Sequence, residues 1–147
     1  MVNLITLRNI DYNNFWEIIE LKVYENQLDF LTSNVVSIAQ SKVQPECITL
    51  AIYNDEKAVG FVMYGIDRND GKYWIYRFMI DRRYQSKGLG KAALQLLINQ
   101  IQQDKAHNKI LLGVHKESIV AIKLYHSLGF EFNGQIFNKE HIMELSY

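Results

Sequence analysis

The chain of 147 residues has one cysteine, one proline, no net charge and no long uncharged apolar run. The single cysteine, Cys47, excludes an internal disulfide, and its apolar neighbours predict a buried thiol. Sixteen basic and sixteen acidic side chains cancel, which argues against the positive field of a nucleic-acid-binding protein. No signal peptide, lipidation motif or membrane-length apolar run is present, so we expect a cytoplasmic protein with no membrane partner.

The composition fits one folded domain. Hydrophobic residues make up 48% of the chain, which argues against disorder, and the length suits a single core spanning residues 1–147. Charge is unevenly distributed along it. Residues 1–56 hold eight acidic and three basic side chains, a net charge of −5, whereas residues 77–91 hold five basic and one acidic, a net charge of +4. One region therefore suits a cation and the other an anion.

Hydrophobic periodicity and turn residues predict two kinds of element. Strands are expected at 3–7, 48–53, 58–66, 73–80, 109–114, 130–133 and 141–145. Helices are expected from Asp11 to about Tyr24, from Ser33 or Asn34 to before Pro45, from Leu89 to about Asp104, and from Ser118 to Ser127. In the second helix the apolar positions are Val35, Val36, Ile38 and Ala39.

The segment Gln85–Lys91 joins a β-rich run to a helix through Gly88 and Gly90. The first N–H groups of a helix lack internal partners and carry partial positive charge, so this connection predicts a phosphate or pyrophosphate site. The two glycines are expected to let the backbone approach a ligand. Nearby cations are expected to assist, and they are Arg82, Arg83, Lys87 and Lys91. Ala92 follows Lys91 where a P-loop has Ser or Thr, and the third glycine of a dinucleotide fingerprint is missing.

Two blocks together resemble the GNAT superfamily of acetyl-CoA-dependent N-acetyltransferases. The first is Gln85-x-x-Gly88-x-Gly90, and the second is Ala121-x-x-Leu124-Tyr125-x-x-x-Gly129-Phe130. The resemblance implies an α/β (α+β) fold with a mixed central sheet of about six to seven strands and about four helices. The helix at Leu89 would connect two parallel strands by a right-handed crossover.

The resemblance also implies the positions that contact acetyl-CoA. The backbone of the strand before the loop would bind the pantetheine arm and polarise the thioester, and the loop would bind the pyrophosphate. The implied cofactor-binding residues are Phe78, Met79, Ile80, Gln85, Ser86, Lys87, Gly88, Leu89, Gly90, Lys91 and Ser118. Ser118 replaces an asparagine that many relatives carry, and capping of the following helix is an equal alternative for it.

Tyr125 matches the position where the family keeps its general acid. A phenol with a pKa of about 10 can protonate a departing thiolate, whose thiol has a pKa of about 8.5. The base stays unassigned, because Tyr76 stands where polyamine-acetylating relatives often have a carboxylate. Proton removal could use a water held by Tyr76 or an acid from the N-terminal helices. No metal site is expected.

Four segments are similar to bacterial spermine/spermidine acetyltransferases, and they are 25–31, 34–40, 59–65 and 77–81. This similarity implies a polyamine acceptor, with Glu25, Asp29 and Tyr76 as its binding residues. The alternatives are a peptide, protein or other small-amine acceptor, or a non-catalytic acyl-CoA-binding sensor. For the assembly, a homodimer is one candidate.

Overall fold

The computed structural model describes residues 4–25, 27 and 31–147. Its strands are β1 (Ile5–Asn9), β2 (Ile48–Asn54), β3 (Lys57–Ile66), β4 (Tyr73–Ile80), β5 (Lys109–His115), β6 (Glu131–Phe137) and β7 (Glu140–Ser146). Its helices are α1 (Phe15–Glu20), α2 (Asn34–Val43), α3 (Leu89–Gln102) and α4 (Ile119–Ser127), with a 3-10 turn at Arg82–Tyr84. The predicted order of elements and the mixed α/β class are confirmed.

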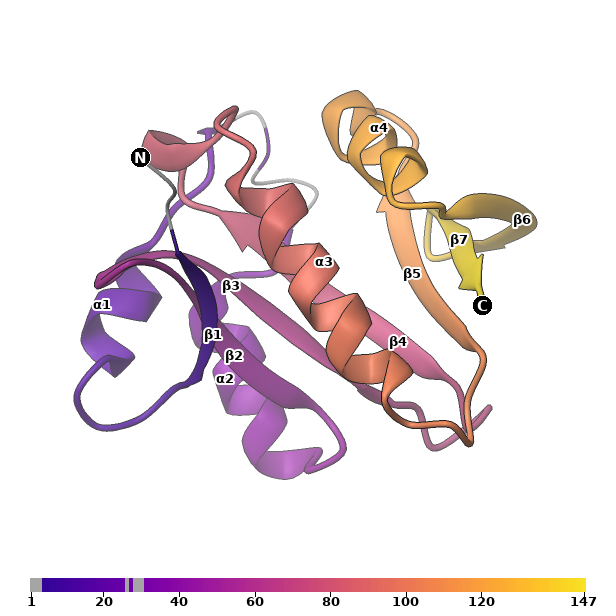
Figure 1. Cartoon of the computed structure of the whole chain (residues 1–147), viewed down its shortest axis with the longest axis horizontal. Coiled ribbons are helices and arrows are strands. Elements are labelled where there is room, and N and C mark those ends of the chain that lie inside the picture. Colours follow the sequence, from indigo (N-terminus) through magenta and orange to yellow (C-terminus); the bar gives the residue numbers. More distant parts are fainter. Residues whose placement is uncertain (1–3, 26, 28–30) are drawn as a thin grey trace.

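The seven strands form one sheet in the order β1-β2-β3-β4-β5-β7-β6. All neighbouring strands are antiparallel except β4 and β5, which are parallel and connected through α3. Figure 1 shows α3 crossing one face of the sheet, with α4 above the end of β5. The crossover therefore places the Gln85–Lys91 loop and α4 at the same end of the sheet, where β4 and β5 have their carboxyl ends.

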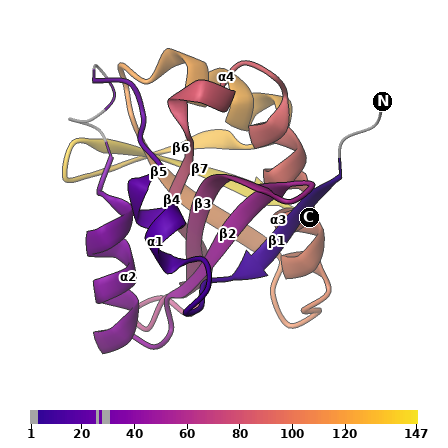
Figure 2. The ribbon, with the colours of Figure 1, turned by 90° about the vertical axis from the view of Figure 1, so that its left-hand side faces the viewer.

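Alternate side chains of β2 enter two separate cores, as the two-residue repeat of a strand requires. Leu50 and Ile52 pack with residues of α3, whereas Ala51 and Tyr53 pack with Ile18 of α1. Figure 2 shows α2 and α3 on opposite sides of the strands. We call the core that contains Ile18 the α1 side core and the other one the α3 core. Cys47 is buried in the α1 side core, as its apolar neighbours predict.

The N-terminal helices differ from the prediction. α1 is shorter, because Asp11 Oδ1 accepts the N–H groups of Asn13 and Asn14 and forms a turn before the helix instead of capping it. Ser33 does cap α2, accepting the N–H of Val36 at 3.2 Å.

The buried face of α2 is also different from the expected one. Val35 and Val36 are about half exposed, whereas Asn34 and Ser37 are buried. The reason is a tertiary contact, since Asn34 Nδ2 donates to the carbonyl of Ile18 at 3.0 Å and fixes α2 against α1.

The strands of the last hairpin are longer than expected. β6 continues past residue 133 to Phe137, and the turn consists of Asn138 and Lys139, both with positive φ.

Candidate active site

β4 and β5 pair only over their first residues and then separate. The pairs are Tyr73–Ile110, Trp74–Leu111 and Ile75–Leu112. Beyond them β4 runs on to Ile80 and β5 to His115, each bonded on its outer side to β3 or β7. Within the described residues the two facing edges are therefore open, and such edges offer backbone N–H and C=O groups to an extended ligand.

The separation begins at a β-bulge in β4. Met63 pairs with Arg77 and Tyr64 with Ile75, so Tyr76 is an extra residue in β4. A bulge bends the strand and redirects its side chains. Tyr76 packs against the α1 side core, and Arg77 Nη2 donates to Gln40 Oε1 of α2 at 3.1 Å. Both side chains therefore lie on the sheet face that α1 and α2 cover.

The loop after β4 has the features of an anion site. Gly88 has a φ of +79°, and a Cβ placed there would meet no atom within 4 Å. The first helical bond of α3 runs from Ala92 N–H to the Gly88 carbonyl, which leaves the N–H groups before it without intrahelical acceptors. Lys87 and Lys91 are exposed beside these groups. The loop thus fits a pyrophosphate.

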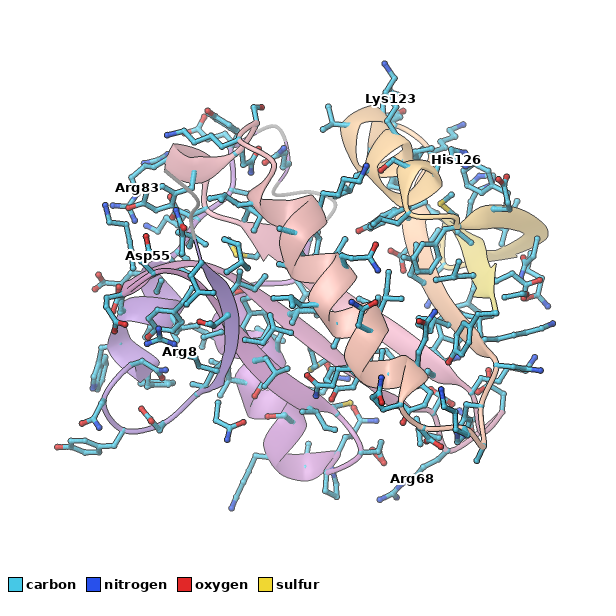
Figure 3. The ribbon with its side chains drawn as sticks, viewed as in Figure 1. Arg8, Asp55, Arg68, Arg83, Lys123 and His126 are labelled. Atoms are coloured by element: carbon cyan, nitrogen blue, oxygen red, sulfur yellow. The ribbon has the colours of Figure 1, made fainter. Side chains whose placement is uncertain are left out.

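One expectation about this loop needs correction, and one of its glycines has a packing role. Arg83 does not add a free cation, because its Nε donates to the buried carboxylate of Asp81 at 2.8 Å; Figure 3 labels it above β1. Gly90 lies where α3 packs on β4, and ligand binding by its backbone stays a prediction. A Cβ on Gly90 would lie 3.2 Å from Phe78 Cζ and 3.4 Å from Ile80 Cγ1, so this glycine lets α3 pack closely on β4.

Gln85 and Ser118 lie beyond the ends of β4 and β5, and their side chains make different contacts. Gln85 Nε2 donates to the Ile80 carbonyl at 2.9 Å and to Gln27 Oε1 at 3.1 Å, so the side chain fastens the loop to the end of β4. Ser118 occupies the N-cap position of α4, but its side chain makes no capping bond. Capping by its hydroxyl is therefore wrong, and a contact with the cofactor stays a prediction.

Tyr125 lies on α4, just beyond the end of β5. It is buried, and its ring meets that of Phe130 edge-on with centroids 6.0 Å apart. Burial raises the pKa of the Tyr125 phenol well above its usual value, and the charge of Glu140 raises it further. The phenol therefore keeps its proton at neutral pH, as an acid must. The neighbouring Leu124 Cδ2 would be 3.7 Å from a Cβ on Gly90, so the two sequence blocks meet in space.

The predicted acceptor residues are only partly brought together. Glu25 is exposed, and Asp29 lies outside the described residues. The Tyr76 hydroxyl donates to Asp67 Oδ2 at 2.9 Å, and desolvation together with this bond raises the pKa of Tyr76. Because Tyr76 is a donor with a firmly held proton, it cannot serve as a base at neutral pH.

Tyr76 also lines a pocket of about 210 Å³ at the opposite end of β4 from Arg83, beside Arg68 in Figure 3. The other lining residues are Gln40, Gln44, Glu46, Cys47, Asp67, Arg68 and Asn69. The sequence prediction missed Asp67. The turn signal at Asp70-Gly71 could have indicated it, since a hairpin there brings the end of β3 beside the start of β4.

Among the described residues, no helix is long and apolar enough to cross a membrane. Within the same residues, no group of three or more His, Cys, Asp or Glu side chains is arranged to hold a metal ion.

Comparisons with known proteins agree with this geometry. Residues 3–130 match the model of the Acetyltransferase (GNAT) family. The chain is 36% identical over 146 residues to the spermine/spermidine N(1)-acetyltransferase of Bacillus subtilis strain 168, covering 95% of this chain and 96% of the relative.

Two solved structures with bound coenzyme A share the fold. The PaiA N-acetyltransferase of Thermoplasma acidophilum superposes with a TM-score of 0.73 at 21% identity, over 98% of this chain and 99% of that one. The aminoglycoside acetyltransferase AAC(6')-Ib superposes with a TM-score of 0.80 at 14% identity, over 97% and 95%. The family match covers most of the chain, and the protein belongs to the GNAT family of acetyltransferases: it is an N-acetyltransferase whose cosubstrate is acetyl-CoA.

Proposed function

We propose that this enzyme transfers the acetyl group of acetyl-CoA to a primary amine of a polyamine such as spermidine or spermine. The observation that carries the proposal is the 36% identity, across nearly the whole chain, to an enzyme named for those two amines. The net charge of −5 in residues 1–56 supports it, because this segment includes the two helices on the Tyr76 face of the sheet.

The cosubstrate supplies a thioester whose carbonyl carbon accepts the amine directly. The open edge of β4 from Arg77 to Ile80 would hold the pantetheine arm and polarise that carbonyl through backbone N–H groups. The Gln85–Lys91 loop would bind the pyrophosphate. Tyr125 would donate its proton to the departing thiolate.

The pocket beside Tyr76 suits a second ammonium group of a long acceptor. It combines the carboxylate of Asp67 with the side-chain amides of Gln40 and Gln44, and it starts at the bulge where the two strands separate. Glu46 contributes less negative charge to the pocket than Asp67 does, because Arg68 Nε pairs with the Glu46 carboxylate. An extended polyamine could therefore place one amine between the strands and another here.

A thiol-release assay with acetyl-CoA and a panel of amines tests the proposal. We expect spermidine and spermine to outperform monoamines of similar length, and the advantage to shrink with salt as charge attraction is screened. Efficient acetylation of a peptide amine together with poor acetylation of every polyamine would refute the polyamine acceptor. It would leave the acetyltransferase assignment intact. No thiol release with any amine would favour an acyl-CoA-binding sensor.

A further inference from the structure

Glu140 is the first residue of β7, directly after the turn of the last hairpin, and it pairs with His115 at the end of β5. Its side chain lies along β5 over Gly113. A Cβ on Gly113 would be 3.0 Å from Glu140 Oε1 and 3.2 Å from Glu140 Cβ and Cδ. The carboxyl can occupy this place because Gly113 has no side chain. Gly113 is also the first residue of β5 beyond its last pair with β4, at Leu112.

The carboxylate therefore stands where the two strands open. It lies on the α2 face of the sheet, because Leu112 packs in the α3 core and side chains alternate along a strand. Arg77, from β4, is bonded to α2 on the same face. The acceptor is expected on this face, which α1 and α2 cover.

Charged and titratable groups from three elements act on Glu140. Desolvation raises the pKa of Glu140, whereas the charges of Arg77 from β4 and His115 from β5 oppose that rise. From α4, Tyr125 responds to the Glu140 charge with a raised pKa. The residue as a whole stays exposed, so an incoming amine can reach the carboxylate.

We propose that Glu140 is the catalytic base that takes a proton from the acceptor ammonium. This rests on the proposed function, an amine acceptor bound on the α2 face. Two other candidates, Tyr76 and Asp81, are less suitable. Tyr76 holds its proton and donates it to Asp67, and the Asp81 carboxylate is buried and occupied by three hydrogen bonds.

The protons and electron pairs of the proposed reaction balance without a further reactant. Glu140 takes one proton from the ammonium, and the freed nitrogen lone pair forms the N–C bond at the thioester carbonyl carbon. The C–S bond then breaks, and its electron pair leaves on sulfur, which receives the Tyr125 proton. Tyr125 is reprotonated by the second proton of the acylated nitrogen, and Glu140 releases its proton to solvent. One amide, one thiol and one proton result.

The test is the pH profile of kcat/KM for spermidine in Glu140→Gln. We expect a decrease of about 10²–10⁴-fold at pH 7, the usual range for a general base. The variant should approach the wild-type rate near pH 10, where much of the amine is already neutral. Glu131→Gln is the matched control. It removes an exposed carboxylate from the partner strand of the same hairpin and should leave the profile unchanged.

Coenzyme A affinity, measured by calorimetry, shows whether each variant is folded. If Glu140→Gln is not, Gly113→Ala replaces it, since the added methyl group would displace the carboxyl from β5 and should give the same change in the pH profile. A folded variant with wild-type turnover at pH 7, or with a raised KM and an unchanged pH profile, would refute the base. A failure of the proposed function is distinct, because the wild-type enzyme itself would then acetylate no polyamine.

Discussion

The Asp81 carboxylate accepts a hydrogen bond from the backbone N–H of Lys22 at 2.9 Å, across 59 positions of the sequence. It also accepts the backbone N–H and Nε of Arg83 at 3.0 and 2.8 Å. Desolvation alone would raise the pKa of Asp81, but the bonds from Arg83 and Lys22 outweigh it and lower the pKa. Asp81 thus joins the chain after α1 to the end of β4, shortly before the Gln85–Lys91 loop.

Asp81→Asn should lower the free energy of unfolding at pH 7 by about 1–3 kcal/mol, because buried donors lose a charged acceptor. The pKa of Asp81 is lower in the folded than in the unfolded protein, so its stabilisation is present above the unfolded pKa and is lost as pH falls through the folded one. The gap between variant and wild type should therefore shrink in acid. Urea unfolding at several pH values measures it, with exposed Glu117→Gln as control. Equal stability at pH 7 would contradict this role.

Gly90→Val should destabilise the fold by about 1–3 kcal/mol, because its methyl groups would be forced against Phe78 and Ile80. Gly90→Ala is the matched control. Its single methyl group is a tight fit, but alanine favours the helix by about 1 kcal/mol over glycine, so the two effects nearly cancel. Urea unfolding measures the free energy of unfolding of both variants, and Gly90→Val should be the less stable of the two. If both were as stable as the wild type, close packing of α3 on β4 would not explain this glycine.

Lys87→Gln combined with Lys91→Gln should weaken coenzyme A binding by about 3–30-fold at low salt, because two exposed cations beside the α3 N-terminus are removed. The loss should diminish at high salt. Calorimetric titration measures the affinity. Lys72→Gln with Lys105→Gln removes the same charge at the other end of α3 and should have little effect. Equal losses in the two double variants would indicate a general field and no localised site.

Tyr125→Phe should lower kcat by about 10²–10⁴-fold with little change in coenzyme A affinity, since the ring and its contact with Phe130 remain. Because burial raises the pKa of the phenol, no alkaline decrease in rate should come from Tyr125 below pH 10. Steady-state kinetics from pH 6 to 10 test both points. Near-normal turnover would make Tyr125 a packing residue. Tyr12→Phe, at a tyrosine 91% exposed, is the control.

Tyr76→Phe and Asp67→Asn should interact in a double-mutant cycle by about 0.5–3 kcal/mol of unfolding free energy, because their side chains share one hydrogen bond. If Asp67 also binds the distal ammonium, Asp67→Asn should raise KM for spermine more than for a short diamine. Additive effects on stability would mean that the bond is not made in solution. Equal changes in both KM values would argue against an ammonium in this pocket.

The sequence alone determined the order of the elements and the position of the glycine-containing loop for which we propose pyrophosphate binding. Both depend on local patterns, namely the two-residue alternation of strands and the glycines before a helix. The prediction of β4 at 73–80 and of α3 starting at Leu89 matched the structure, because turn residues bound both segments. The two motif blocks were recognisable without coordinates, and their contact through Gly90 and Leu124 was not.

Only the tertiary structure decided which side chains are available for chemistry. The bulge at Tyr76 depends on the register of β4 with β3. The bond from the Lys22 N–H to Asp81 depends on a contact across 59 positions of the sequence. The position of Glu140 depends on the missing side chain of Gly113. The exposure of Val35 follows in the same way from the bond between Asn34 and Ile18. Each involves a backbone register or a contact between segments separated along the chain, and periodicity in one segment carries no information about its partner in another.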